Sequence, residues 1–448
     1  MYTFSSKLKT FSIALMLLGV VGIAIGFMSA PSSTEEVEQM LSESHGHHAE
    51  ATSHDAHATH AVADAHGAHN TDVKHADAEH KAHLEHVLHQ QQNKPWAAFY
   101  VACIFFMLLS VGVLAFYAIQ YAAQAGWSPI LFRVMEGITG YLLPGSIIFI
   151  LVLVAAGMHL NHLFVWMDPE VVAHDHLIQG KSGYLNVPFF LGRAVVFLLL
   201  WNFFRMKMRK YSIDQDTATS FIPYKKNFKL AATFLVIFIV TESLMSWDWI
   251  MSVDPHWYST LFAWYVFASF FVCGITTIAL ITIYLKSKGY LPNVNTSHLH
   301  DLAKFMFGIS IFWTYLWFSQ FMLIWYSDIP EEVTYFVTRI EHYKLPFFGM
   351  LVMNFVFPLL ILVNTDFKRL SWIIVMAGIV ILCGHYIDFF NMIMPATVGD
   401  QWFIGLPEIS SIAFFLGLFI FVVFTTLTKA PLEPKGNPLI EESKHFHY

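Results

Sequence analysis

Charged and titratable side chains stand within, or at the ends of, stretches of this sequence that are otherwise strongly apolar. They are His159, His162, Asp168, Arg193, Glu242, Asp248, Asp254, His385 and Asp388. Carboxyl and imidazole groups in such places can hold or pass a proton, and a charge inside a bilayer usually faces a helix-bundle interior and a partner. We therefore treat these residues as candidates for a proton pathway. The alternative for each residue is that it only fastens neighbouring helices, with a contribution on the order of 0.6 kcal/mol per contact.

Three of the acids follow one another at intervals of six residues. Glu242, Asp248 and Asp254 lie in the segment TESLMSWDWIMSVDPHWYST. On a helix, Asp248 would lie about 9 Å and Glu242 about 18 Å along the axis from Asp254. Six residues also turn Asp248 about 120° away from Glu242, so the two carboxylates cannot share one narrow face. Each is expected to have a partner on a different helix.

Two further pairs have the spacing that places side chains on the same face of a helix. His159 and His162 are three residues apart, and so are His385 and Asp388. Side chains at this spacing are neighbours on a helix surface. The sequence therefore predicts two local pairs in which a proton can be shared.

The composition identifies the elements that must carry these groups. The chain of 448 residues is 56% hydrophobic, 17% aromatic and only 13% charged, with a mean hydropathy of +0.54. Soluble domains are about a quarter charged and just under half apolar. The sequence therefore predicts an all-α polytopic membrane protein.

Ten spans of roughly 20 residues are predicted, since this length crosses about 30 Å of hydrocarbon. Their limits are 10–30, 96–124, 141–166, 187–206, 230–253, 259–285, 303–327, 345–364, 371–394 and 407–428. With the N-terminus in the cytoplasm, most of the 25 Lys and Arg residues fall on the cytoplasmic side, as the positive-inside rule requires. Both termini are then cytoplasmic, the first span is an uncleaved anchor, and all the candidate groups lie between the midplane and the opposite surface.

The segment 31–95 is the one long extramembrane loop that we predict, and it holds more than half of the 24 histidines. Histidines recur every three residues in two runs, which are His54, His57 and His60, and then His80, His83, His86 and His89. On a helix this spacing stacks imidazoles that could chelate zinc, copper or nickel. The alternative is a solvated periplasmic loop without a defined metal site.

Several kinds of cofactor site are excluded by the motifs. Cys103, Cys273 and Cys383 lie far apart within spans, without the paired spacing of covalently bound haem or of iron–sulfur clusters. There is no phosphate-binding loop and no dinucleotide fingerprint. Nothing in the sequence indicates binding to a nucleic acid.

An internal duplication is suggested by matching span ends. Pro255 follows Asp248 by seven residues, and Pro395 follows Asp388 by seven residues. This pattern is consistent with two four-helix bundles made of spans 2–5 and 6–9. The predicted domains are an anchor helix at 1–30, the His-rich loop at 31–95, a first bundle at 96–253, a second bundle at 259–394, and a last span with a cytoplasmic tail at 395–448.

Several stretches resemble the ActF subunits of bacterial alternative complex III, which belong with the NrfD-like membrane anchors of polysulfide-reductase type. These stretches are ESLMSWDWIMSVDPHWYSTLFAWYVFAS, HLNHLFVWMDPE and the N-terminal MYTFSSKLKTFSIALMLLGV with GFMSAPSSTEEVEQML. The resemblance covers essentially the whole chain, and the first stretch is its most specific part. The resemblance does not identify the His-rich loop as a feature of the family.

The resemblance implies two four-helix bundles plus two flanking helices in the bacterial inner membrane. It implies a quinol:cytochrome c or quinol:oxidase oxidoreductase whose other subunits are a multihaem cytochrome, an iron–sulfur subunit, a monohaem cytochrome and a paralogous anchor, ActC. A terminal oxidase is a further expected partner. Haem c and iron–sulfur clusters belong to the partners, and this chain is expected to carry no cofactor and no catalytic residue. The better-supported quinol site is in ActC, so quinone binding by this chain is not expected. Its implied role is to supply polar half-channels for protons from the nine residues named above.

Two other functions stay open at this point. Buried acids and a duplicated bundle are equally natural in a stand-alone proton-coupled secondary transporter. The same fold would also suit the quinol-binding anchor of a related reductase of the molybdoenzyme type.

Overall fold

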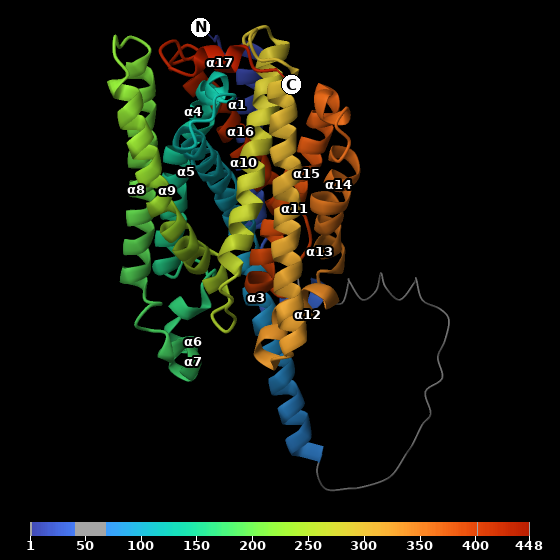
Figure 1. Ribbon diagram of the computed structural model, residues 1–448. Helices are drawn as coiled ribbons and strands as arrows, with labels where there is room; N and C mark the ends of the chain where they lie inside the picture. Colours follow the sequence, from blue (N-terminus) through green and yellow to red (C-terminus); the bar gives the residue numbers. More distant parts are fainter. Residues whose placement is uncertain (1, 41–68, 401, 448) are drawn as a thin grey trace.

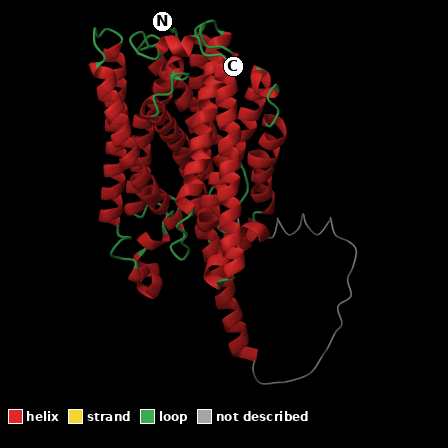
Figure 2. Ribbon diagram, in the orientation of Figure 1, coloured by secondary structure: helices red, strands yellow, loops and turns green. Residues whose placement is uncertain are grey.

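The computed structural model describes residues 2–40, 69–400 and 402–447. Every regular element in these ranges is a helix (Figure 1, Figure 2). Ten of the helical segments described there are long and apolar enough to cross a membrane. The predicted class, an all-α polytopic membrane protein, is confirmed.

The spans follow the chain in order, and four of them are composite or form part of a longer helix. They are α1 (Ser6–Met28); the part of α3 (His69–Ala122) that begins at Val87; the run of η1 (Pro129–Leu131), α4 (Phe132–Ile138), η2 (Thr139–Tyr141) and α5 (Leu142–Gly157); α8 (Val187–Gln215); α9 (Ile222–Trp249) with η4 (Met251–Val253); α10 (Phe262–Ser287); α11 (Thr296–Ser327); the run of α13 (Lys344–Leu351), η5 (Val352–Val356) and α14 (Phe357–Leu362); α15 (Ser371–Val398); and α16 (Leu406–Leu427). The shorter elements are η3 (Val165–Met167), α6 (Pro169–His174), α7 (His176–Gly180), α12 (Pro330–Glu341), η6 (Phe367–Arg369) and α17 (Ile440–Lys444).

The two ends of the bundle differ in what they carry. Both chain termini lie at one end, which we call the terminal end (Figure 1). The opposite end, which we call the loop end, carries α6, α7 and α12, and α3 extends well beyond it (Figure 1). An even number of spans accounts for the termini sharing an end.

The central helix of the bundle is α3. It packs against α5, α9, α10, α15 and α16, and nearly all residues of its most apolar stretch are buried. A helix that is apolar all round must be surrounded in this way or face lipid. Its closest neighbour is α10, because a Cβ at Gly112 would lie 2.6 Å from the carbonyl oxygen of Phe270, and one at Gly274 would lie 2.8 Å from the backbone nitrogen of Val113. Glycine at both positions lets the two backbones touch.

The remaining helices are arranged on both sides of the α3–α10 pair. In the first group α5 packs against α3 and α8, and α8 packs against α9. In the second group α11 and α15 pack against α10, and α13 and α14 pack against α15. The flanking helices α1 and α16 pack on each other, and α16 also contacts α3. The domain boundaries given above stay predictions.

Several predicted span limits differ from the ends of the helices. The second span was expected to begin at 96, but α3 is already helical from His69 and its apolar part begins at Val87. The third span was expected at 141–166, but it begins at Pro129 and α5 ends at Gly157. The seventh was expected to begin at 303, but α11 begins at Thr296, where Asn295 caps it.

The arrangement predicts which surfaces are accessible from each side of the membrane. Gly183 lies in the loop before α8 with open space around it, and Lys288 is exposed between α10 and α11 at the terminal end. In a background without the native cysteines, Gly183→Cys and Lys288→Cys should react with a membrane-impermeant maleimide from opposite sides. Labelling of both from the same side of sealed spheroplasts would contradict the topology.

Candidate functional site

Asp388 lies in the middle of α15 and is, like Asp248, a fully enclosed acid in the described part of the chain. Its side chain is fully buried and accepts hydrogen bonds from three other side chains. Tyr265 donates to Oδ1, while Ser269 and Trp313 each donate to Oδ2 at 2.8 Å. Tyr265 and Ser269 come from α10 and Trp313 from α11. The carboxyl group therefore joins three helices of the second group.

His385 lies beside this carboxyl group, one helical turn away. Its Nδ1 is 3.6 Å from Asp388 Oδ2, so the predicted pair does share a face. The Ser269 hydroxyl bridges the two, because it lies 2.9 Å from His385 Nδ1 and donates to Asp388. A hydroxyl that accepts from one group and donates to another can relay a proton between them. The other ring nitrogen, Nε2, is buried without a hydrogen-bond partner among the described residues.

A turn of π-helix brings a further polar group to this cluster. The segment η5 interrupts the α13–α14 span, and turns of this kind are frequent at functional sites. It places the fully buried Asn354 with its Nδ2 3.4 Å from His385 Nδ1. Gly384 allows this approach, because a side chain there would collide with Asn354 and Met353.

The loop-end side of the same helix is held by an arginine. Pro395 lies inside α15 and has no N–H, so the carbonyl of Asn391 has no partner in the helix. Arg339 of α12 donates from Nε to that carbonyl at 2.9 Å. Its guanidinium also lies over the Tyr335 ring, 3.4 Å from the centroid. The proline kink thus fixes α12 to α15.

In the first group, Asp248 of α9 is paired with Arg193 of α8. The guanidinium donates from Nε to Oδ2 at 2.6 Å and from Nη2 to Oδ1 at 3.0 Å. Asp248 is fully buried and Arg193 is 8% exposed. The guanidinium also lies over the rings of Tyr184 and Phe189, at 3.9 and 4.2 Å from their centroids. As predicted, Asp248 has its partner on another helix.

The two buried aspartates therefore have different chemistry. Arginine stays protonated in proteins, so Arg193 holds Asp248 in a fixed ion pair. Asp388 is surrounded by groups that can exchange a proton or only donate a hydrogen bond, namely His385, Tyr265, Ser269 and Trp313. Of the two, Asp388 is the one without a permanently charged partner among the described residues.

Glu242 differs from the prediction that it has a partner on another helix. It is buried, at 4% exposure, but its hydrogen bonds within the described chain go to Ser246 at 3.1 Å and Ser243 at 3.4 Å, both on α9. Serine hydroxyls on the next residue and one turn away can satisfy a carboxyl group without any second helix. Glu242 is therefore a buried acid with no cationic partner in the described residues.

The predicted His159–His162 pair on a helix face is wrong. The helix α5 ends in a Schellman motif, in which His159 N–H bonds to Ala156 and Leu160 N–H bonds to Ala155. His159 takes the left-handed position with φ 58°. Both histidines are exposed at the loop end.

The neighbouring acid Asp168 is also at the loop end. Its Oδ1 caps α6 by accepting from the N–H of Glu170 at 2.9 Å. Its Oδ2 lies 4.0 Å from Nδ1 of His162, and the His162 ring packs edge-on against His89 of α3. These groups form a partly exposed titratable surface rather than a buried pair.

Asp254 lies at the loop end as expected, with its side chain half-exposed. It accepts from the N–H of His256 at 3.2 Å, and His256 Nε2 lies 2.5 Å from Asp175. The hydrogen bond from His256, with those from the backbone N–H groups of Ile178 and Leu177, holds the pKa of Asp175 below its ordinary value. These contacts fasten α7 to the turn after α9.

The histidine runs of the predicted metal site are only partly described. His54, His57 and His60 lie outside the described residues, and the backbone of His80, His83 and His86 belongs to α3. Within the residues that the structure describes, no group of three or more His, Cys, Asp or Glu side chains could hold a metal ion. The metal site stays a hypothesis.

One buried charge cluster was missed, and it lies at the terminal end. Arg133 donates to Glu136 at 2.8 Å and to Asp216 at 2.6 Å, and Tyr117 donates to Glu136 at 2.9 Å. Buried charges are therefore not confined to the loop-end half, where all the candidates were expected. The span was expected to begin at 141, after these residues, because Arg133 and Glu136 interrupt the apolar pattern. Arg133 and Glu136 are of opposite charge and one helical turn apart, so they can neutralise each other. This spacing could have indicated that the span begins before them.

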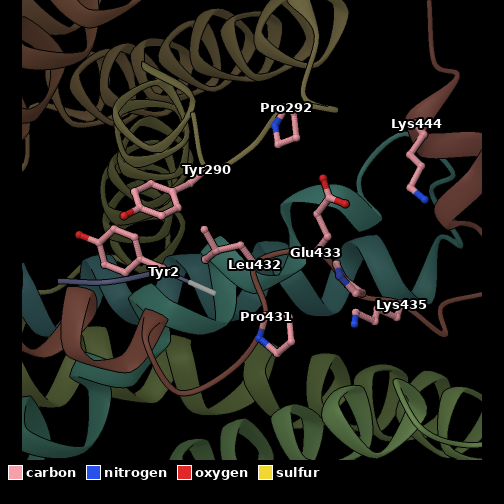
Figure 3. A pocket seen from close by; sticks show the side chains of 9 residues that line it. Tyr2, Tyr290, Pro292, Pro431, Leu432, Glu433, Lys435 and Lys444 are labelled. Carbon is pink, nitrogen blue, oxygen red and sulfur yellow. The ribbon is translucent and has the colours of Figure 1, made fainter. Parts of the chain in front are cut away.

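The same end carries a surface cavity of about 340 Å³, lined by residues near both chain termini and by the loop between α10 and α11 (Figure 3). The rings of Tyr2 and Tyr290 meet in it edge-on, and Glu433 is held by Asn293 at 2.8 Å. Its remaining lining is Pro292, Pro431, Leu432, Pro434, Lys435 and Lys444. None of the nine candidates lines it, so the cavity is separate from the predicted proton pathway.

Comparison with known proteins identified no relative of this chain. The sequence matches no protein-family model and no curated protein.

Breaking the Arg193–Asp248 pair should destabilise the protein. Asp248→Leu leaves a buried guanidinium unpaired, and loss of one partner of a buried pair costs about 3–5 kcal/mol. Replacing both residues, as Arg193→Leu with Asp248→Leu, should cost less than the sum of the two single changes. Unfolding in mixed micelles of mild detergent and dodecyl sulfate would measure all three free energies. Single effects that add to within about 0.5 kcal/mol would show that the residues are not coupled.

Proposed function

We propose that this chain is a membrane subunit of a quinol-oxidising respiratory complex of the alternative complex III type. Its role is to supply proton-carrying groups and structural support. The terminal end faces the cytoplasm and the loop end faces the periplasm of a bacterial inner membrane. The resemblance of its sequence to ActF subunits supports the complex, and the distribution of basic residues supports the orientation.

The observation that carries the proton role is the cluster around Asp388. A fully buried carboxyl group, a buried imidazole and a hydroxyl bridging them form a short relay between α10 and α15. A proton on His385 Nδ1 can pass to the Ser269 hydroxyl while that hydroxyl gives its own proton to Asp388. Tyr265 then connects the carboxyl group toward the loop end, since α10 begins there.

Oxidation of a quinol releases two protons and two electrons. In this proposal the electrons pass to haem c and iron–sulfur clusters of the partner subunits, and the quinol is bound by the ActC-like paralogue. Asp388, His385 and Glu242 carry protons, whereas Arg193 and Asp248 hold the first bundle together. The partly exposed groups His159, His162, Asp168 and Asp254 lie where protons would leave.

Isolation of the protein tests the assignment to a complex. The tagged chain, purified from its native membrane in mild detergent, should carry with it subunits that show haem c absorbance and iron–sulfur electron paramagnetic resonance. A homo-oligomer without either signal that binds a transported solute would contradict the proposal and favour a proton-coupled transporter.

Loss of the Asp388 carboxyl group should block the relay while the complex still assembles. Asn can accept hydrogen bonds from Tyr265, Ser269 or Trp313 but cannot take up a proton. Asp388→Asn is therefore expected to lower quinol-dependent turnover by roughly 100-fold, a usual scale for loss of one proton-transfer group. Asp366→Asn removes the same charge at an exposed position and serves as the matched control. Unchanged turnover and unchanged proton release in Asp388→Asn would return Asp388 to a structural role.

A further inference from the structure

Basic residues gather on the last turns of α8, at the terminal end. Arg205, Arg209 and Lys210 line a surface hollow of about 320 Å³ together with Met206, Ile213 and Asp214. Lys207 lies on the same turns and is exposed. Figure 1 shows that α8 is at the outer edge of the bundle. The hollow therefore opens where the protein meets the membrane.

The positive charge of the hollow is not neutralised by the protein around it. Arg205 has no hydrogen bond or ion pair among the described residues, and its Nε is buried without a partner. Arg209 uses one nitrogen to donate to the carbonyl of Thr426 at 3.1 Å. The acid whose charge acts on both arginines, Glu136, is already bonded to Arg133 and Tyr117. Asp214 is the one acid that lines the hollow, against three cations.

The spacing of the two arginines favours an anion between them. Arg205 and Arg209 are four residues apart on one helix, so their charges are neighbours and repel each other. A bound anion would convert this repulsion into two attractive contacts. A guanidinium matches the oxygens of a phosphate group with two parallel hydrogen bonds. The chemistry of the hollow therefore fits a phosphate.

An apolar strip leads from the hollow toward the middle of the membrane. Val196, Leu199, Phe203 and Met206 follow one another along α8, and their side chains are 52%, 65%, 45% and 51% exposed. The distance from Leu199 to Met206 along the axis is about 10 Å. The strip and the hollow thus present apolar surface and then positive charge, in the order of the acyl chains and the phosphate of a lipid.

We propose that this hollow binds the headgroup phosphate of an anionic phospholipid whose acyl chains lie along the apolar strip of α8. The guanidinium groups of Arg205 and Arg209 hold the phosphate oxygens, and Lys210 adds a third charge at the rim. A free phosphate ion shares the headgroup chemistry but makes no use of the strip. This site is independent of the function proposed above.

The test uses the full chain in the assembly in which it is isolated, in mild detergent, with phosphatidylglycerol as the probe. Native mass spectrometry should show phosphatidylglycerol bound in preference to phosphatidylcholine. The double change Arg205→Gln with Lys210→Gln should weaken that binding at least about tenfold. Lys288→Gln removes a charge at the same end but away from α8 and should leave the binding unchanged.

Other outcomes would overturn the proposal. Equal binding of phosphatidylcholine, or equal loss in Lys288→Gln, would mean that no specific site exists. Displacement of the lipid by millimolar inorganic phosphate would assign the hollow to free phosphate. A photoactivatable phosphatidylglycerol provides a test on the unchanged protein, because its acyl chain should crosslink to residues 196–206. Crosslinks elsewhere and none on α8 would exclude the site even if the variants failed to fold.

Discussion

Hydrocarbon provides no hydrogen-bond partners, so a polar side chain inside the bilayer is stabilised when another part of the protein pairs with it. This constraint explains why the buried polar residues occur in sets that join helices. Asp388 joins α15 to α10 and α11, Arg193 joins α8 to α9, and Arg133 joins α4 to the end of α8. The apolar contact between α3 and α10 brings the helix groups together, and the polar sets then decide which rotation of each helix is allowed.

The two helix groups meet this constraint with different chemistry at comparable places. In each group an aspartate precedes a proline by seven residues, at Asp248 and at Asp388. The first is matched by a permanent cation on the neighbouring helix α8, which strengthens the contact between the two helices. The second is matched by hydroxyl, indole and imidazole groups, none of which carries a permanent charge. Matching positions in the two groups thus carry a structural ion pair in one case and a hydrogen-bonded carboxyl group in the other.

Much of the fold was predictable from the sequence, because ten long apolar segments are unmistakable and need membrane to cover them. The helix ends were less predictable, since a Schellman motif at His159 depends on backbone geometry that no apolar pattern indicates. The pairing of Arg193 with Asp248 was not predictable, because residues 55 apart meet only through packing. Tyr265, Ser269 and Trp313 are ordinary residues of membrane helices, so their role around Asp388 appears only when three helices are assembled.

The length of α3 has a consequence for the space outside the membrane. Its residues 69–86 precede the apolar part of the helix, and 18 residues of helix extend about 27 Å. Beyond the loop end, α3 therefore projects by a length close to the thickness of the hydrocarbon layer. A protein that rests on this surface cannot lie flat across it. It must have a recess that accommodates the projecting part of α3, or else bind entirely to one side and contact this helix laterally.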